Sequence, residues 1–120
     1  MYFTSEEKKA IIRVAGEMTL AVGNVAPKEV VFNVGVFHKL DISQSEIESS
    51  GSMSMPNAMH IISKMTSNEK RFVSAYIGSI IIVDGDISDK ELALWRLIST
   101  ICEFPTMHLK DTPSILQEYL

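Results

Sequence analysis

Two segments of the chain are copies of each other, and this repeat constrains the fold more than any other feature. Residues 4–29 align without a gap with residues 66–91, at an offset of 62 positions, and eight of the 26 aligned positions are identical. A repeat of this length predicts a duplicated helix–loop–helix unit whose two halves share one core. The aligned glycines Gly23 and Gly85 are each expected to end a helix with a positive φ.

The predicted fold is all-α. With 120 residues the chain suits a single domain (residues 1–120), and we expect a bundle of about seven helices with an internal pseudo-twofold repeat. The two halves cover residues of about 4–40 and 66–103. No segment alternates with period two, so no strand is predicted. Helix starts are marked by a Ser or Thr followed three residues later by Glu: Thr4/Glu7, Ser43/Glu46, Thr66/Glu69 and Ser88/Glu91.

Apolar residues indicate which helix is central. They cover most of the C-terminal half of the helix that begins near Thr66, so this helix is predicted to be buried, with Trp95 or its neighbours packing against Ile80. The helix that follows Pro27 carries a run of valines with Phe37, which we interpret as its apolar face. The segment Glu48–Ser54, with one glycine and four serines, is predicted to be a surface loop.

Charge and composition argue against several classes of protein, among them nucleic-acid-binding, secreted and membrane-inserted proteins. The net charge of −4 predicts no nucleic-acid partner. The N-terminus is charged where a signal peptide would be apolar, and the apolar stretch Ile77–Val83 is too short to insert directly into a membrane, so we expect a cytoplasmic protein. The only cysteine, Cys102, lies in an apolar run and is interpreted as a buried small hydrophobe.

The second loop of the repeat is acidic. Asp84, Asp86 and Asp89 precede Glu91 on the next helix, and oxygen ligands of this kind can bind a hard divalent cation, Ca²⁺ or Mg²⁺. Spacing alone also fits simple helix capping, since Ser88 and Glu91 form a capping pair and Asp89 suits the positive end of a helix. The first loop carries fewer acids, and Glu29 is its remaining carboxylate.

No catalytic motif is present, and the chain is predicted not to be an enzyme. Phosphate-binding loops, dinucleotide-binding glycines, zinc-protease helices and nucleophile elbows are all missing from the sequence. The histidines His38, His60 and His108 are far apart, and we interpret them as surface residues. No cofactor other than the divalent cation is expected.

The duplicated loop resembles the TerB-like family, helical domains named after a bacterial tellurite-resistance protein. The segment 83–91 is similar to the family's Asp-Gly–x–apolar–Ser–x–x–Glu signature, and 21–29 resembles a degraded copy in which Val22 stands where the family has an acid. The resemblance covers most of the chain. It implies an all-helical fold, a non-enzymatic role in stress response or scaffolding, and divalent-metal binding by the acidic residues Asp84, Asp86, Glu91 and Glu29.

Two hypotheses follow from the sequence. The first is a TerB-like metal-responsive or scaffolding domain. The second is a protein-interaction module or homodimer that binds neither a metal nor a small molecule. Both imply a protein partner, which the sequence does not identify.

Overall fold

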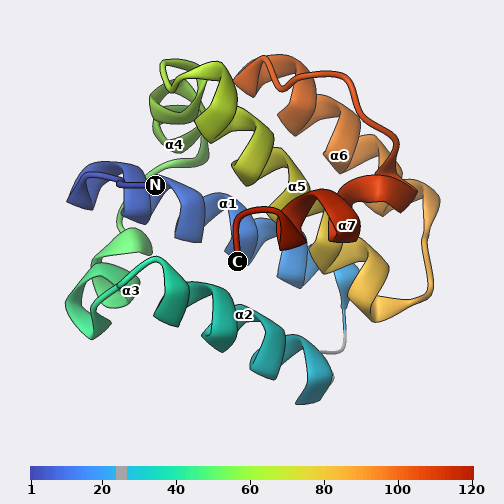
Figure 1. The fold of residues 1–120 in the computed structure, drawn as a ribbon, viewed down its shortest axis with the longest axis horizontal. Helices are drawn as coiled ribbons and strands as arrows, with labels where there is room; N and C mark the ends of the chain where they lie inside the picture. The colour runs from blue at the N-terminus through green and yellow to red at the C-terminus, as the bar shows by residue number, and fades with distance from the viewer. Residues whose placement is uncertain (24–26) are drawn as a thin grey trace.

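Seven α-helices and one 3₁₀ turn make up the described part of the chain, and none of it forms a strand (Figure 1). The computed structural model describes the backbone of residues 1–23 and 27–120, without the side chains of Pro27, Glu29 and Asp84. The predicted all-α, single-domain bundle is confirmed. The elements are α1 (Ser5–Val22), α2 (Pro27–Lys39), α3 (Gln44–Ser50), α4 (Met55–Ser63), α5 (Ser67–Asp84), α6 (Asp89–Cys102), η1 (Leu109–Asp111) and α7 (Thr112–Gln117).

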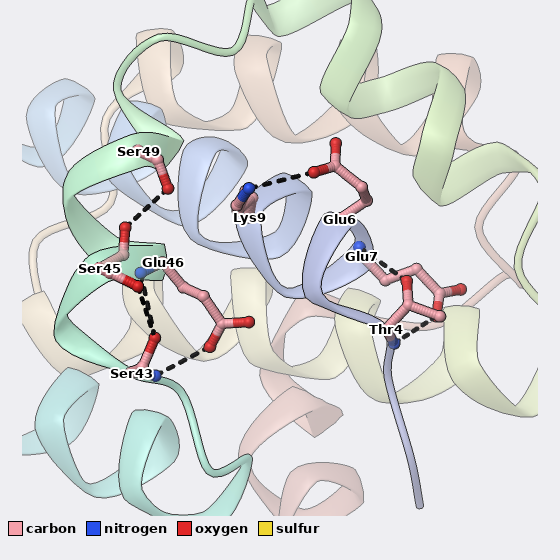
Figure 2. Close-up of polar contacts among 8 residues, drawn as sticks. All are labelled: Thr4, Glu6, Glu7, Lys9, Ser43, Ser45, Glu46 and Ser49. Carbon is pink, nitrogen blue, oxygen red and sulfur yellow. Dashed lines mark hydrogen bonds and ion pairs between the residues drawn. The ribbon is translucent and has the colours of Figure 1, made fainter.

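Reciprocal capping boxes start three of these helices. Figure 2 shows two of them: at α1 the Thr4 hydroxyl accepts from the Glu7 N–H at 3.2 Å, and the Glu7 carboxylate accepts from the Thr4 N–H at 2.8 Å. Ser43 and Glu46 make the same pair of bonds at α3, and α5 repeats the box at Thr66. Each box satisfies two backbone donors that a helix leaves free, which explains why these starts can be predicted from sequence.

The repeat also fixes where helices end. Gly23 follows α1 with φ 97°, and Gly85 follows α5 with φ 83°, so both predicted positive angles are confirmed. Asp41 and Glu103 are also 62 positions apart, and they are the two non-glycine residues with positive φ in the described chain, at 55° and 58°. The duplication is therefore visible in the backbone after α2 and α6, beyond the aligned segments.

One further pair extends the repeat to the last helix. The Ser50 hydroxyl donates to the Ile47 carbonyl at 2.6 Å, and 62 positions later the Thr112 hydroxyl donates to the Leu109 carbonyl at 2.7 Å. The end of α3 in the first half therefore corresponds to η1 and the start of α7 in the second. The predicted loop Glu48–Ser54 is partly wrong, because α3 continues to Ser50 before the chain turns.

The core lies around α1 and α5, which contact each other (Figure 1). Helix α1 also contacts α6, and α5 also contacts α2, an exchange expected of two halves related by an approximate two-fold axis. Ile77, Ile80 and Ile81 of α5 are buried, with Trp95 and Ile98 of α6 in the same apolar cluster. The prediction that α5 is the buried central helix is confirmed. No helix in the described residues combines the length and the apolar character needed to cross a bilayer.

The C-terminal helix packs on α5 through a close backbone approach and a polar clamp. Gly78 faces Thr112, whose methyl carbon lies 2.5 Å from where a Cβ at position 78 would stand. Seven residues earlier on α5, Arg71 binds both carboxylate oxygens of Glu118 at 3.0 and 3.1 Å and donates to the Tyr119 hydroxyl. The bond from Arg71 lowers the pKa of the Glu118 carboxyl.

Candidate functional site

Three of the carboxylates that the sequence predicts as metal ligands lie in or beside the loop between α5 and α6, and Glu29 lies on α2. Asp86 is exposed, whereas Glu91, on the first turn of α6, is only 3% exposed. The side chains of Asp84 and Glu29 lie outside the described part of the chain. Among the described residues no three His, Cys, Asp or Glu side chains form a group suited to hold a metal ion. The predicted metal site therefore stays a prediction.

Glu91 differs from the glutamates of the three reciprocal capping boxes. The Ser88 hydroxyl accepts from the Glu91 N–H at 3.2 Å and donates to Glu91 Oε1, 3.0 Å away. The other carboxylate oxygen, Oε2, is buried and has no hydrogen-bond partner among the described residues. Burying a polar atom without a partner destabilises the folded state, so Glu91 has acceptor capacity that its helix cap does not use.

A second charged side chain lies in an apolar part of α1. Glu17 is paired with Arg13, whose Nη1 lies 2.6 Å from Glu17 Oε1, and the glutamate side chain stays partly exposed. Arg13 Nε also donates to the Met53 carbonyl at 2.8 Å, which ties α1 to the segment before α4.

Two neighbouring cavities lie along α1. The first, of about 530 Å³, lies between α1, α2 and the end of α3. The second, of about 420 Å³, lies between α1 and α6. Glu17 and Leu20 line both, so the cavities form one depression, which we name the α1 trough. Its lining includes Gly16, Asn33, Phe37 and Ser50 in the first cavity, and Ala21, Lys90, Leu94 and Leu97 in the second.

Large aliphatic side chains in the α1 trough and on the neighbouring helix α2 remain exposed. Leu20, between the two cavities, is 72% exposed, and Val31 of α2 is 71% exposed. Val30 and Val34 of α2 and Leu97 of α6 are also at least half exposed. The sequence gives α2 an apolar face, but the structure places that face largely in solvent. Val36 is the buried valine of α2.

The sequence contained a signal for this difference. The valines at positions 30, 31, 34 and 36 of α2 do not fall on one stripe of helical period, so one helix cannot bury all of them against the same core. In the second half, the positions equivalent to Val31 and Val34 are Ala93 and Arg96, which are ordinary exposed residues. The first half thus places two valines where its own duplicate has an alanine and an arginine.

Two of the reactive side chains, Cys102 and Tyr76, are buried. Cys102 is buried, as predicted, and burial raises the pKa of its thiol to about 12. Burial likewise raises the pKa of Tyr76, whose hydroxyl donates to the Asn33 side chain. The three histidines are exposed, which confirms their interpretation as surface residues.

Comparisons with known proteins identify a relative of this chain among the solved structures. No protein-family model matches the chain, and no curated protein matches it. Among solved structures, the chain is similar to a protein of unknown function, PG1108, from Porphyromonas gingivalis W83. The two sequences are 36% identical, the match covers 98% of this chain and 92% of that chain, and the TM-score is 0.80.

Proposed function

This chain belongs to the same family as the Porphyromonas gingivalis protein of unknown function, and we propose that it is a non-enzymatic protein-interaction domain. The proposed binding surface consists of the α1 trough and the exposed valines of α2. The proposal keeps the TerB-like relationship, with a scaffolding or stress-response role in the cytoplasm. The observation that carries it is the exposed aliphatic border of the trough.

The exposed valines of α2 are not needed by the fold. Val30, Val31 and Val34 lie within four positions of one another, so they form a continuous aliphatic strip on one side of α2. Single exposed apolar residues are common, but a contiguous strip beside a cavity is typical of interaction surfaces. The adjoining trough supplies a concave surface with both apolar and charged side chains, Leu20 and Glu17 among them.

A photo-crosslinking amino acid at position 31 tests this function. We expect the chain carrying it to form a discrete higher-mass adduct on irradiation in cells of the source organism. The same amino acid at position 117, an exposed position on α7, serves as the control and is expected to give no such adduct. If positions 31 and 117 crosslink equally, or if neither crosslinks, the α2 surface is not the binding site.

A second candidate function is weak binding of Ca²⁺ or Mg²⁺ at the acidic loop, and the buried Glu91 Oε2 favours it. A hard cation would satisfy a carboxylate oxygen that has no donor, and Asp84, Asp86 and Glu29 are the other predicted ligands. With so few protein ligands the cation would keep several waters, so we expect a dissociation constant of about 10⁻⁴–10⁻³ M, as for other weak calcium sites.

Thermal melting with added cation tests this candidate. Millimolar Ca²⁺ or Mg²⁺ should raise the melting temperature of the parent chain, because a ligand of the native state stabilises it. Glu91→Gln keeps the shape of the side chain but removes its charge, and Asp84→Asn does the same in the loop. Both should abolish the rise. An unchanged melting temperature in the parent would exclude the metal site and leave the interaction function standing.

A further inference from the structure

The packing around one pair of equivalent glycines, Gly16 and Gly78, differs between the two halves of the molecule. Gly78 of α5 is in close contact with Thr112, because any Cβ at position 78 would lie 2.5 Å from the threonine methyl carbon and 2.9 Å from its hydroxyl. Thr112 itself is fully buried there. The glycine at position 78 therefore allows the small β-branched side chain of Thr112 to approach the backbone of α5.

Gly16, the counterpart of Gly78 on α1, has no such neighbour. A Cβ built at Gly16 meets no atom of the described residues within 4 Å, and the position opens into the α1 trough. The residue equivalent to Thr112 is the smaller Ser50, which lines the same cavity without closing on the glycine. Glycine is unfavourable inside a helix, so Gly16 costs stability without any packing gain within this molecule.

The side chains suited to this opening are present on the same face of the molecule. Valine has nearly the shape of threonine, with a methyl in place of the hydroxyl. Val30 lies three positions from Asn33, and Val34 lies three positions from Phe37. Asn33 and Phe37 line the trough, so these two valines lie next to it on α2. A ridge and a groove side by side on one surface allow two copies to fill each other's groove across a two-fold axis.

Charge and area agree with such a pairing. Glu17 and Lys90 both line the trough and have opposite charges, so a two-fold axis can bring each opposite the other. Five exposed side chains, each worth on the order of 60–120 Å² when fully buried, offer roughly 200–400 Å² of aliphatic surface per copy: Leu20, Val30, Val31, Val34 and Leu97. A standard interface buries about 800 Å² per partner, somewhat more than half of it apolar, so these side chains supply a large part of what a dimer needs.

We infer that the α1 trough is filled by α2 of a second copy of this chain, with a valine of that helix against Gly16. The inference rests on the proposed interaction function and names its partner. The pairing is reciprocal: each copy contributes one valine strip and one trough. The packing of Thr112 on Gly78 in the second half of the molecule is its internal precedent.

Sedimentation equilibrium tests the inference on the full chain over about 1–300 µM, the range in which weak dimers associate. The parent should shift from the monomer mass toward twice that mass as concentration rises. Val31→Lys should weaken the dimer at least about 30-fold, which is a loss of about 2 kcal/mol. Leu20→Lys, on the other side of the same contact, should do likewise. Gln117→Lys, on exposed α7, adds the same charge and should associate as the parent does.

The outcomes separate this inference from the function on which it rests. A parent that stays monomeric throughout, or a Gln117→Lys variant that loses as much association as Val31→Lys, overturns the second copy as partner. If Val31→Lys does not fold by circular dichroism, Leu20→Lys decides. A monomeric parent whose position 31 crosslinks to a protein of another mass refutes the dimer alone and keeps the interaction function.

Discussion

Replacing Gly16 by alanine should raise the free energy of unfolding, whereas replacing Gly78 by alanine should leave it unchanged or lower it. Both glycines lie inside long helices with ordinary φ, so both replacements gain about 1 kcal/mol from helix propensity. At Gly16 the new methyl group meets open space, and the gain should be realised in full. At Gly78 it must overlap Thr112, whose hydroxyl is already held by the Leu109 carbonyl at 2.7 Å.

The magnitude of the difference follows from that overlap. Forcing extra volume into a packed site costs about 1–3 kcal/mol, which matches or exceeds the propensity gain. Gly78→Ala should therefore be neutral or destabilising by as much as about 2 kcal/mol, while Gly16→Ala stabilises by about 1 kcal/mol. The propensity term is common to both variants, so the difference between them measures the packing of α7 on α5. For a domain of this size it corresponds to a separation of about 4–12 °C in melting temperature.

Thermal and urea unfolding followed by circular dichroism, at low protein concentration, provides the measurement. A third variant isolates the cause: in a Thr112→Ala background the clash is relieved, so Gly78→Ala should become stabilising there. Equal effects of alanine at the two glycines, or no rescue by Thr112→Ala, would refute the close packing of Thr112 on Gly78. They would also remove the contrast from which the role of Gly16 is inferred.

Three further predictions concern the core, a helix end and a capping carboxylate. Ile80→Ala should destabilise the fold by about 2–5 kcal/mol in urea unfolding, because Ile80 is buried in the core; a near-neutral result would contradict its central place. Gly85→Ala should cost about 1 kcal/mol, and Gly85→Val more, because φ is 83° there; melting curves that match the parent would refute this. The pKa of the Glu46 carboxyl is lowered, mainly by the hydrogen bond that it accepts from the Ser43 N–H. The ionised carboxylate therefore stabilises the folded state above the ordinary pKa of 4.5, and this stabilisation is lost as the pH falls through the lower pKa of the folded state. Glu46→Gln should accordingly lower the melting temperature at pH 7 but not at pH 2, and an equal deficit at both would contradict the ionised cap.

Most of the fold was predictable because its signals are local. A capping box is a contact between residues three apart, and a positive φ at Gly23 or Gly85 depends on the absence of one Cβ. Both features can be predicted from the sequence because neither depends on tertiary contacts. The 62-residue offset then indicates which local elements are equivalent. At Ser88 the same pattern gave a different geometry, because Glu91 accepts from the serine hydroxyl rather than from its backbone N–H.

The candidate site was less predictable because it depends on differences between the halves in three dimensions. The sequence directs attention to the acidic loop, where carboxylates gather. The α1 trough arises instead from small or polar residues in the first half, at places where the second half has larger ones. Asn33 corresponds to Trp95, and Ser50 corresponds to Thr112. No local pattern shows that these substitutions open a single surface, since their positions converge only after folding.

The two halves therefore have different tasks within one architecture. Both halves contribute to the core, but the second half places larger side chains at two equivalent positions: Tyr76 and Trp95 are buried where the first half has Val14 and Asn33. The Asn33 side-chain oxygen accepts a hydrogen bond from the Tyr76 hydroxyl across the interface between α2 and α5. Leu20 of α1 and Val30, Val31 and Val34 of α2 are exposed and lie outside this core. A duplicated unit that no longer needs both of its faces for folding can use the second face to bind another protein. In this chain the α1 trough is the face that we propose for this role.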